Sequence, residues 1–161
     1  MTKEQIEKKL ENGVKNPFER RELEGRLRTI EVYPEGEFKF TDGKYTCYDA
    51  YTEKNGVKDV LIEIKTRDCN HDTYDTAYFE YGKYCNMRRV MESTGARMMV
   101  YISHYKDGVS LMWNVTNLHK LPVVELRLSR TTSGDRTMTT KRMYELPIKL
   151  ANKRSKDDSN N

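Results

Sequence analysis

The sequence lacks the features that mark several common classes of protein. It has three cysteines, Cys47, Cys69 and Cys85, and no Cys-x-x-Cys pair, which argues against a disulfide framework and a zinc ribbon and favours a reducing compartment. No apolar run approaches the roughly 20 residues of a membrane span, and the segment Met1–Leu10 is highly charged. We therefore expect no signal peptide, no membrane partner and a cytoplasmic protein. The phosphate-binding P-loop, HExxH, GxSxG and GxGxxG motifs are also absent, which removes the commonest nucleotide-hydrolase, zincin, serine-hydrolase and dinucleotide-binding classes.

Length and charge set looser bounds. The 161 residues include 29 basic and 25 acidic side chains, so the net charge of +4 permits nucleic-acid binding without indicating it. A chain of this size suits one domain, which we place at residues 1–150, and the polar segment 151–161 is expected to be a disordered tail. A homo-oligomer is compatible with the sequence, but nothing in the sequence indicates one.

Hydrophobic periodicity and turn residues predict an α+β fold, α/β/α-like, with a mixed β-sheet flanked by helices and an extra C-terminal β-hairpin. The expected elements are, in order, helices over Lys3–Glu11 and from Pro17 to about Arg28, three antiparallel strands between Ile30 and Lys65, a strand over Thr76–Glu80, a helix over Tyr81–Ser93, strands over Ala96–Ser103 and Val109–Val115, and a hairpin of Val123–Arg130 with Met138–Leu146.

One of these predicted strands carries a charged pair on a defined face. Val60, Ile62 and Ile64 alternate with Glu63 and Lys65, and strand side chains alternate with period two, so the carboxylate and the ammonium share the face opposite the apolar one. Acid-x-Lys triplets also occur at residues 7–9, 37–39 and 42–44, but none of those has an aspartate before it. The triplet at residues 63–65 is therefore the strongest candidate for a catalytic site, and an exposed ion pair on a half-buried strand is the alternative.

Asp49 precedes this strand on the neighbouring one, and the hairpin between them decides whether it can join Glu63. A two-residue Asn55-Gly56 loop would place Asp49 opposite Ile62, on the wrong face. A three-residue loop from Lys54, with Gly56 left-handed, would place Asp49 opposite Leu61 and diagonal to Glu63. We expect the three-residue loop.

Two converging carboxylates form an oxygen-rich site that suits Mg²⁺ or Mn²⁺. Asp49 and Glu63 are the candidate metal ligands, and the carbonyl of Ile64 is a third. Lys65 is then placed to orient and deprotonate a water or to offset charge in a phosphoryl-transfer transition state. This chemistry is phosphodiester hydrolysis.

The order of these parts resembles the PD-(D/E)XK nuclease superfamily over roughly Pro17 to Val115. The resemblance implies a restriction-endonuclease-like fold, with Asp49 and Glu63 as metal ligands and Lys65 as the catalytic lysine. Tyr48-Asp49 stands where the family has Pro-Asp. Many members also carry an acidic residue on the first helix, for which Glu19 is our first choice and Glu22 the second.

The resemblance extends to one later helix. Some relatives place a lysine and a tyrosine after the core strands, so Lys83 and Tyr84 are candidates to contact a phosphate or the attacking water, although Glu80 replaces the glutamine of those relatives. An exposed helix start with buried tyrosines explains the same pattern equally well. The arrangement is also similar to small proteins encoded by tailed bacteriophages, which would place the protein in the host cytoplasm.

Three functions remain open. The leading one is a Mg²⁺-dependent nuclease with DNA as the expected partner, and the second is a nuclease-fold protein that does not cut and binds nucleic acid or a phage or host protein. The third is a purely structural α+β domain. A separate loop contains Asp68, His71, Asp72 and Asp75, which is either a second metal cluster or, as we expect, a solvated loop.

Overall fold

The computed structural model describes residues 1–41, 46–129 and 137–156. Within these ranges the fold is mixed α and β. The elements are α1 (Lys3–Glu11), α2 (Pro17–Val32), β1 (Lys39–Phe40), β2 (Ala50–Lys54), β3 (Val57–Thr66), β4 (Thr76–Glu80), α3 (Tyr81–Thr94), β5 (Met98–His104), β6 (Ser110–Asn114), β7 (Val124–Ser129), β8 (Met138–Pro147) and β9 (Asn152–Arg154), with short 3₁₀ turns at Leu118–Lys120 and Ile148–Leu150.

The larger sheet has the strand order β1-β2-β3-β5-β6-β9. Its first three strands are antiparallel neighbours, β3 and β5 are parallel, and β6 is antiparallel to β5. A parallel pair needs a crossover connection, and here β4 and α3 supply it. The predicted mixed sheet is therefore present.

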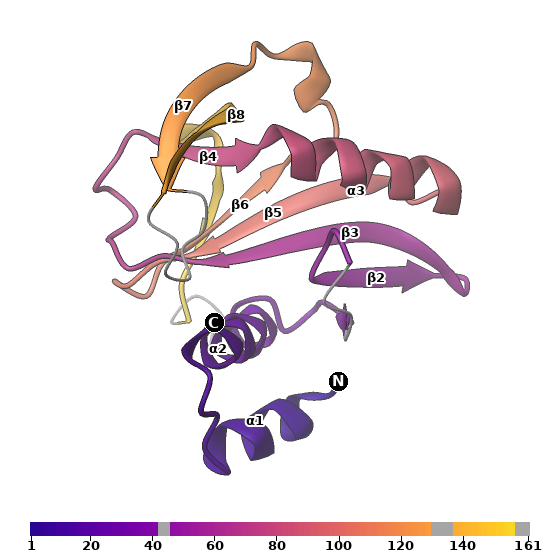
Figure 1. Ribbon diagram of the computed structural model, residues 1–161. Helices are drawn as coiled ribbons and strands as arrows, with labels where there is room; N and C mark the ends of the chain where they lie inside the picture. Colours follow the sequence, from indigo (N-terminus) through magenta and orange to yellow (C-terminus); the bar gives the residue numbers. More distant parts are fainter. Residues whose placement is uncertain (42–45, 130–136, 157–161) are drawn as a thin grey trace.

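Helices and a second sheet cover the two faces of this sheet (Figure 1). On one face α2 lies against β3, and α1 packs on α2. Ile62, Val100 and Ile102 point to this side and join the side chains of the two helices. On the other face α3 and the three-stranded sheet β4-β8-β7 enclose a second core that contains Leu61 and Tyr101. Side-chain alternation in β3 thus supplies both cores.

Local sequence explains where α1 and α2 begin, but not where α2 ends. Thr2 forms a capping box with Gln5 at the start of α1, and the Asn16 side chain accepts a hydrogen bond from the Phe18 N–H at the start of α2. Left-handed Gly95 ends α3 close to the predicted position. The predicted end of α2 near Arg28 was wrong, because packing of its last turn against the sheet extends the helix to Val32, which is fully buried.

The C-terminal region differs from the prediction in two ways. The hairpin of β7 and β8 forms, but β8 also pairs with β4, so the hairpin belongs to a second sheet. Residues Asn152–Arg154 were expected in a disordered tail, yet they form β9 along the edge of β6. Pairing with an open strand edge can order a polar segment that has no core of its own. The end of that expected tail, 157–161, lies outside the described residues.

The hairpin between β2 and β3 also corrects the prediction. Lys54 pairs with Val57, so the loop is the two-residue Asn55-Gly56 turn, with φ of 53° and 79°. Both values are positive, as the type I′ turn of a tight hairpin requires. The expected three-residue loop was wrong, and an irregularity lies instead inside the ladder, where the register shifts between Thr52 and Glu53.

No helix in the described part of the chain is long and apolar enough to cross a membrane. The cysteines Cys47, Cys69 and Cys85 are free thiols.

Candidate functional site

Asp49 lies beside Glu63, although not by the expected pairing. The register places Tyr51, not Asp49, opposite Leu61. Asp49 stands just before β2, where its N–H donates to the Ile62 carbonyl at 2.9 Å and its Oδ2 accepts from the Ile64 N–H at 2.7 Å. Because Asp49 is outside the regular strand, period-two alternation does not fix its face. Its carboxylate therefore reaches along the β3 edge to Glu63.

The Ile64 carbonyl shares this edge. In an extended strand the N–H and C=O of one residue point to the same side, and the Ile64 N–H points to Asp49. All three predicted ligand groups, from Asp49, Glu63 and Ile64, thus lie near the start of β2, where β3 continues past its pairing with β2.

Glu63 is a buried carboxyl with only one oxygen paired. It is 8% exposed, and its Oε1 accepts a hydrogen bond from Lys83 Nζ at 2.6 Å. Its Oε2 is buried and has no hydrogen-bond partner among the described residues. Burial and then the neighbouring Asp49 charge raise the Glu63 pKa to about 8, against the opposing effect of Lys83. The attraction of Lys83 therefore does not offset the effects that raise the Glu63 pKa.

The two lysines at the site have opposite pKa shifts. Lys65 is half-buried, and burial followed by the nearby Arg67 charge lowers the pKa of its ammonium. Burial also acts to lower the pKa of Lys83, but attraction to Glu63 and Asp49 outweighs it and the net shift is upward. Lys65 is thus the more readily deprotonated amine, and Lys83 is the fixed cation.

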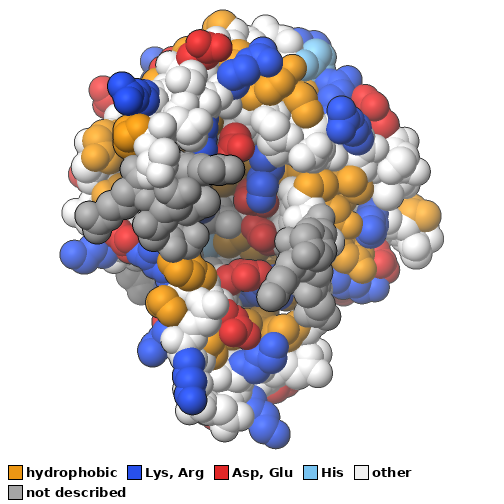
Figure 2. Space-filling view, viewed as in Figure 1, with side chains coloured by type: hydrophobic (Ala, Val, Ile, Leu, Met, Phe, Trp, Pro, Cys, Tyr) orange, Lys and Arg blue, Asp and Glu red, His pale blue; other side chains and the backbone are white. Residues whose placement is uncertain are grey.

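Asp49, Glu63 and Lys65 line a pocket of about 390 Å³ between β3 and the first half of α2, which we call the edge pocket. Acidic and basic side chains gather along the hollow in Figure 2, between the positions of α3 and α2 in Figure 1. The edge pocket is lined by Phe18, Arg21, Glu22, Gly25, Arg26, Asp49, Glu63, Ile64, Lys65, Thr66, Arg67 and Asp68.

The helix residue chosen first from the sequence does not reach the pocket. Glu19 is exposed and does not line it, whereas Glu22, the second choice, does and pairs with Arg26. The pocket side of α2 carries Phe18, Glu22 and Gly25, spaced by one helical turn. Glu19 follows Phe18 by one residue, so these two side chains point about 100° apart around the helix axis.

Three cations of the pocket were not among the predicted site residues. Arg67 continues the two-residue alternation of Glu63 and Lys65, so strand periodicity alone could have indicated it. No comparable sequence pattern places Arg21 and Arg26 at the pocket, since their positions depend on how α2 crosses the sheet. Arg26 is 5% exposed, and its Nε is buried without a hydrogen-bond partner among the described residues.

Tyr84, proposed alongside Lys83, belongs to the core. It is 2% exposed, and its hydroxyl bonds to the Thr116 carbonyl at 3.2 Å and to His119 Nδ1 at 2.8 Å. It packs edge-on against Tyr144. The core alternative for this tyrosine is therefore the one that the structure supports.

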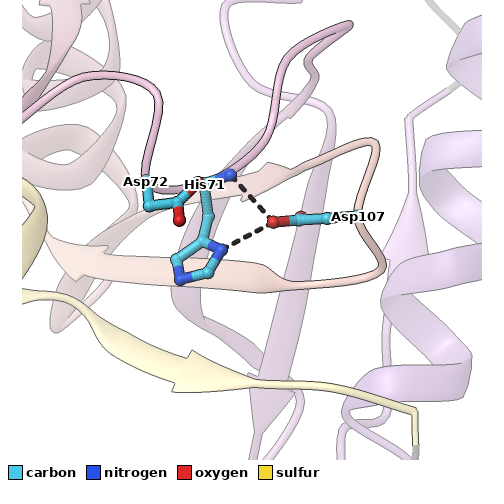
Figure 3. A group of neighbouring side chains, drawn as sticks. All are labelled: His71, Asp72 and Asp107. Carbon is cyan, nitrogen blue, oxygen red and sulfur yellow. Dashed lines mark hydrogen bonds and ion pairs between the residues drawn. The ribbon is translucent and has the colours of Figure 1, made fainter.

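A second group of ligand-type side chains lies where the loop after β3 meets the turn between β5 and β6 (Figure 3). His71, Asp72 and Asp107 place possible ligand atoms within 4.8 Å of one another, the one such group of three or more found in the described ranges. His71 Nδ1 bonds to Asp107 Oδ2 at 2.7 Å, and Lys153 Nζ lies 2.9 Å from Nε2. Both ring nitrogens are thus engaged, and the lysine charge opposes a metal at Nε2.

The edge pocket fits a hard divalent cation better. Its donors are two carboxylates and a backbone carbonyl, and Mg²⁺ is usually held by one or two carboxylates with several waters. The buried, unpaired Glu63 Oε2 and the raised pKa of Glu63 both indicate a place where added positive charge would be stabilising.

Comparison of the chain with protein-family models, with curated proteins and with solved structures found no match.

Proposed function

We propose that this protein is a Mg²⁺- or Mn²⁺-dependent nuclease that hydrolyses phosphodiester bonds, with DNA as its substrate. The observation that carries the proposal is the meeting of Asp49 and Glu63 on the open edge of β3, inside a pocket that also contains Lys65. The order of an N-terminal helix, three antiparallel strands, a crossover helix and a parallel strand supports the restriction-endonuclease-like fold that the resemblance implies.

Asp49, Glu63 and the Ile64 carbonyl would hold the cation, which supplies positive charge for the phosphoryl oxygens and makes water more acidic. Asp49 is positioned for this by the Ile64 N–H. Lys83 donates to Glu63 Oε1 and leaves Oε2 as the ligand oxygen.

Lys65 would act on the attacking water or on the charge that develops at phosphorus. Its lowered pKa brings the amine closer to the range in which it can accept a proton. Arg26 and Arg67 line the same pocket and offer N–H donors to phosphate oxygens. Phosphoryl transfer is catalysed chiefly by such positioning and charge, which these residues provide.

One observation favours a non-cutting nucleic-acid-binding protein as the second candidate. Lys83 already pairs with Glu63, and Asp49 already accepts the Ile64 N–H, so both carboxylates also have structural partners. A protein that had lost catalysis could keep both interactions.

A cleavage assay separates the two candidates. Native protein with Mg²⁺ or Mn²⁺ should cut linear, nicked or branched DNA, and Lys65→Ala should reduce the rate by about 100-fold or more, as loss of a general base or of a transition-state charge does. The Lys54→Ala variant removes an exposed lysine outside the edge pocket and should cut at the native rate. If the native protein binds DNA but cuts none of these substrates, the non-cutting candidate replaces the nuclease.

A further inference from the structure

A second pocket begins where β3 ends. It has a volume of about 220 Å³, and we call it the tyrosine pocket. Ala77, Tyr105 and Ile148 form apolar parts of its wall, and Tyr78 also lines it. Tyr74 lines the pocket as well, although 68% of this residue is exposed to solvent. A large aromatic side chain held out in solvent beside an apolar hollow is a place where a flat ring can stack.

The size and chemistry of the tyrosine pocket limit what can enter it. Pockets for drug-sized ligands measure roughly 300–1,000 Å³, so this smaller volume suits a single ring system. The lining includes the Asn70 amide, which offers both a hydrogen-bond donor and an acceptor. A nucleobase has this combination of flat faces and a polar edge.

Arg67 connects the tyrosine pocket to the proposed nuclease site, because it lines both pockets. Its backbone N–H donates to the His104 carbonyl at 2.8 Å, and its Nη2 donates to the Tyr101 hydroxyl at 2.7 Å, so the guanidinium is held in place. A fixed cation between a carboxylate-lined pocket and an aromatic-lined pocket fits a group that carries a phosphate on one side and a base on the other.

We propose that the tyrosine pocket receives one unpaired base of the strand whose phosphate lies in the edge pocket, with Arg67 contacting the phosphate between them. This inference rests on the proposed function and narrows its substrate to nucleic acid with an unstacked base near the bond that is cut: a single strand, an overhang or a branch. A fully paired duplex offers no such base without the energetic cost of unstacking it.

The test is a set of binding measurements on the full-length protein in EDTA, where metal-dependent cleavage does not alter the probe. The dissociation constant of a fluorescently labelled single-stranded DNA is compared with those of a series of strands, each with one abasic position. Every strand is measured with native protein and with Tyr74→Ala. Tyr74→Ala should weaken binding of the intact strand by roughly 5- to 100-fold, the usual range for loss of one base–aromatic stack. One of the abasic strands should bind native protein as weakly as the intact strand binds Tyr74→Ala. For that strand, Tyr74→Ala should cause little further loss of affinity.

Two control variants separate stacking from general disturbance. Tyr74→Phe keeps the ring and should bind the intact strand as native protein does. Leu121→Ala removes another exposed apolar side chain, 47% exposed and outside both pockets, and should change nothing. Because Tyr74 is mostly exposed, none of these variants should lower the unfolding temperature measurably.

The outcomes distinguish failure of this inference from failure of the proposed function. If the loss of affinity from Tyr74→Ala adds to the loss from the abasic site at every position, the tyrosine pocket holds no base. The nuclease proposal is then still tested by the cleavage assay. If a free mononucleotide binds at Tyr74 as tightly as the strand does, the pocket is a small-molecule site and the inference is overturned. If native protein binds no single-stranded DNA in EDTA, this inference is overturned, and the cleavage assay with metal decides the proposed function separately.

Discussion

At the scale of single residues, the hydrogen bonding of Glu63 shows where added positive charge would stabilise the edge pocket. Lys83 occupies one of its oxygens and the other is buried without a partner among the described residues. Asp49 adds a second negative charge beside it. A buried and a half-buried carboxylate with a single close lysine repel each other when both are ionised, and a divalent cation between them would remove that repulsion.

Glu63→Gln should therefore abolish stabilisation by metal. Added Mg²⁺ should raise the unfolding temperature of native protein, since a ligand at 100 times its dissociation constant stabilises the folded state by about 2.7 kcal/mol. The Glu63→Gln variant should show no such rise. In EDTA this variant should be at least as stable as native protein, because the substitution removes repulsion with Asp49.

The matched control for that measurement is Asp107→Asn, which alters the His71 cluster instead. This variant should retain the full rise with Mg²⁺. The opposite result, with the rise in unfolding temperature lost in Asp107→Asn and kept in Glu63→Gln, would place the metal site at His71, Asp72 and Asp107.

Strand alternation predicts that Glu63 and Lys65 share one face of β3. Both line the edge pocket, as do Ile64 and Thr66, because the pocket lies at the edge of the strand. Asp49 was placed by a wrong loop, because the turn type and an irregularity inside the ladder both shift the register. The tyrosine pocket was not predicted at all, since it depends on contacts between loops far apart in the sequence.

At the scale of elements, the close approach of α2 to β3 shapes the edge pocket. A Cβ on Gly25 would meet Thr66 Oγ1 at 3.0 Å and Ile64 Cγ2 at 3.3 Å. Glycine at this helical position costs about 1 kcal/mol relative to alanine, so the close approach is maintained against local helix propensity. The helix can therefore bring Glu22 and Arg26 next to the β3 edge.

Gly25→Ala should destabilise the protein by about 1–2 kcal/mol, because overpacking at this crossing exceeds the gain in helix propensity. Thr66→Ala removes the closest contact atom, so in that background Gly25→Ala should cost less or become stabilising. Urea unfolding of the single and double variants measures this coupling. Glu24→Ala, at the exposed neighbouring position, should stay within about 0.5 kcal/mol of native protein.

At the element scale, the type and order of the helices and strands were predicted well, and the pairing of the strands less well. Caps and turn residues placed the break between α1 and α2, the start of α2 and the end of α3 close to where the structure has them. The pairing of β4 with β8, and of β9 with β6, was missed. Both pairings join segments distant in sequence, and edge pairing leaves little trace in the composition of a polar strand such as Asn152–Arg154.

At the scale of the whole molecule, buried polar contacts join the helical layer to the sheet. His104 on β5 is fully buried, with Nε2 2.8 Å from Thr29 Oγ1 on α2 and Nδ1 2.7 Å from Ser110 Oγ on β6. The Thr29 hydroxyl donates to the Gly25 carbonyl, so it accepts from Nε2–H, and the imidazole is neutral with Nδ1 accepting from Ser110. Burial, and then the Arg28 charge, lowers the His104 pKa from 6.5 to about 3.

This neutral histidine should make the whole fold sensitive to acid. Between pH 6.5 and about 3 the unfolded chain binds a proton at His104 that the folded chain does not, so folding stability falls as the pH falls, by at most about 1.4 kcal/mol per pH unit from this group. Above pH 6.5 the contribution is complete and does not change. His104→Gln keeps a polar side chain but cannot titrate, so its stability measured by urea unfolding should decline less steeply from pH 6.5 to 4 than that of native protein. Because every other titrating group is common to the two chains, the difference between their curves isolates His104, and parallel curves would mean that this histidine takes up its proton without disturbing the contact between α2 and the sheet.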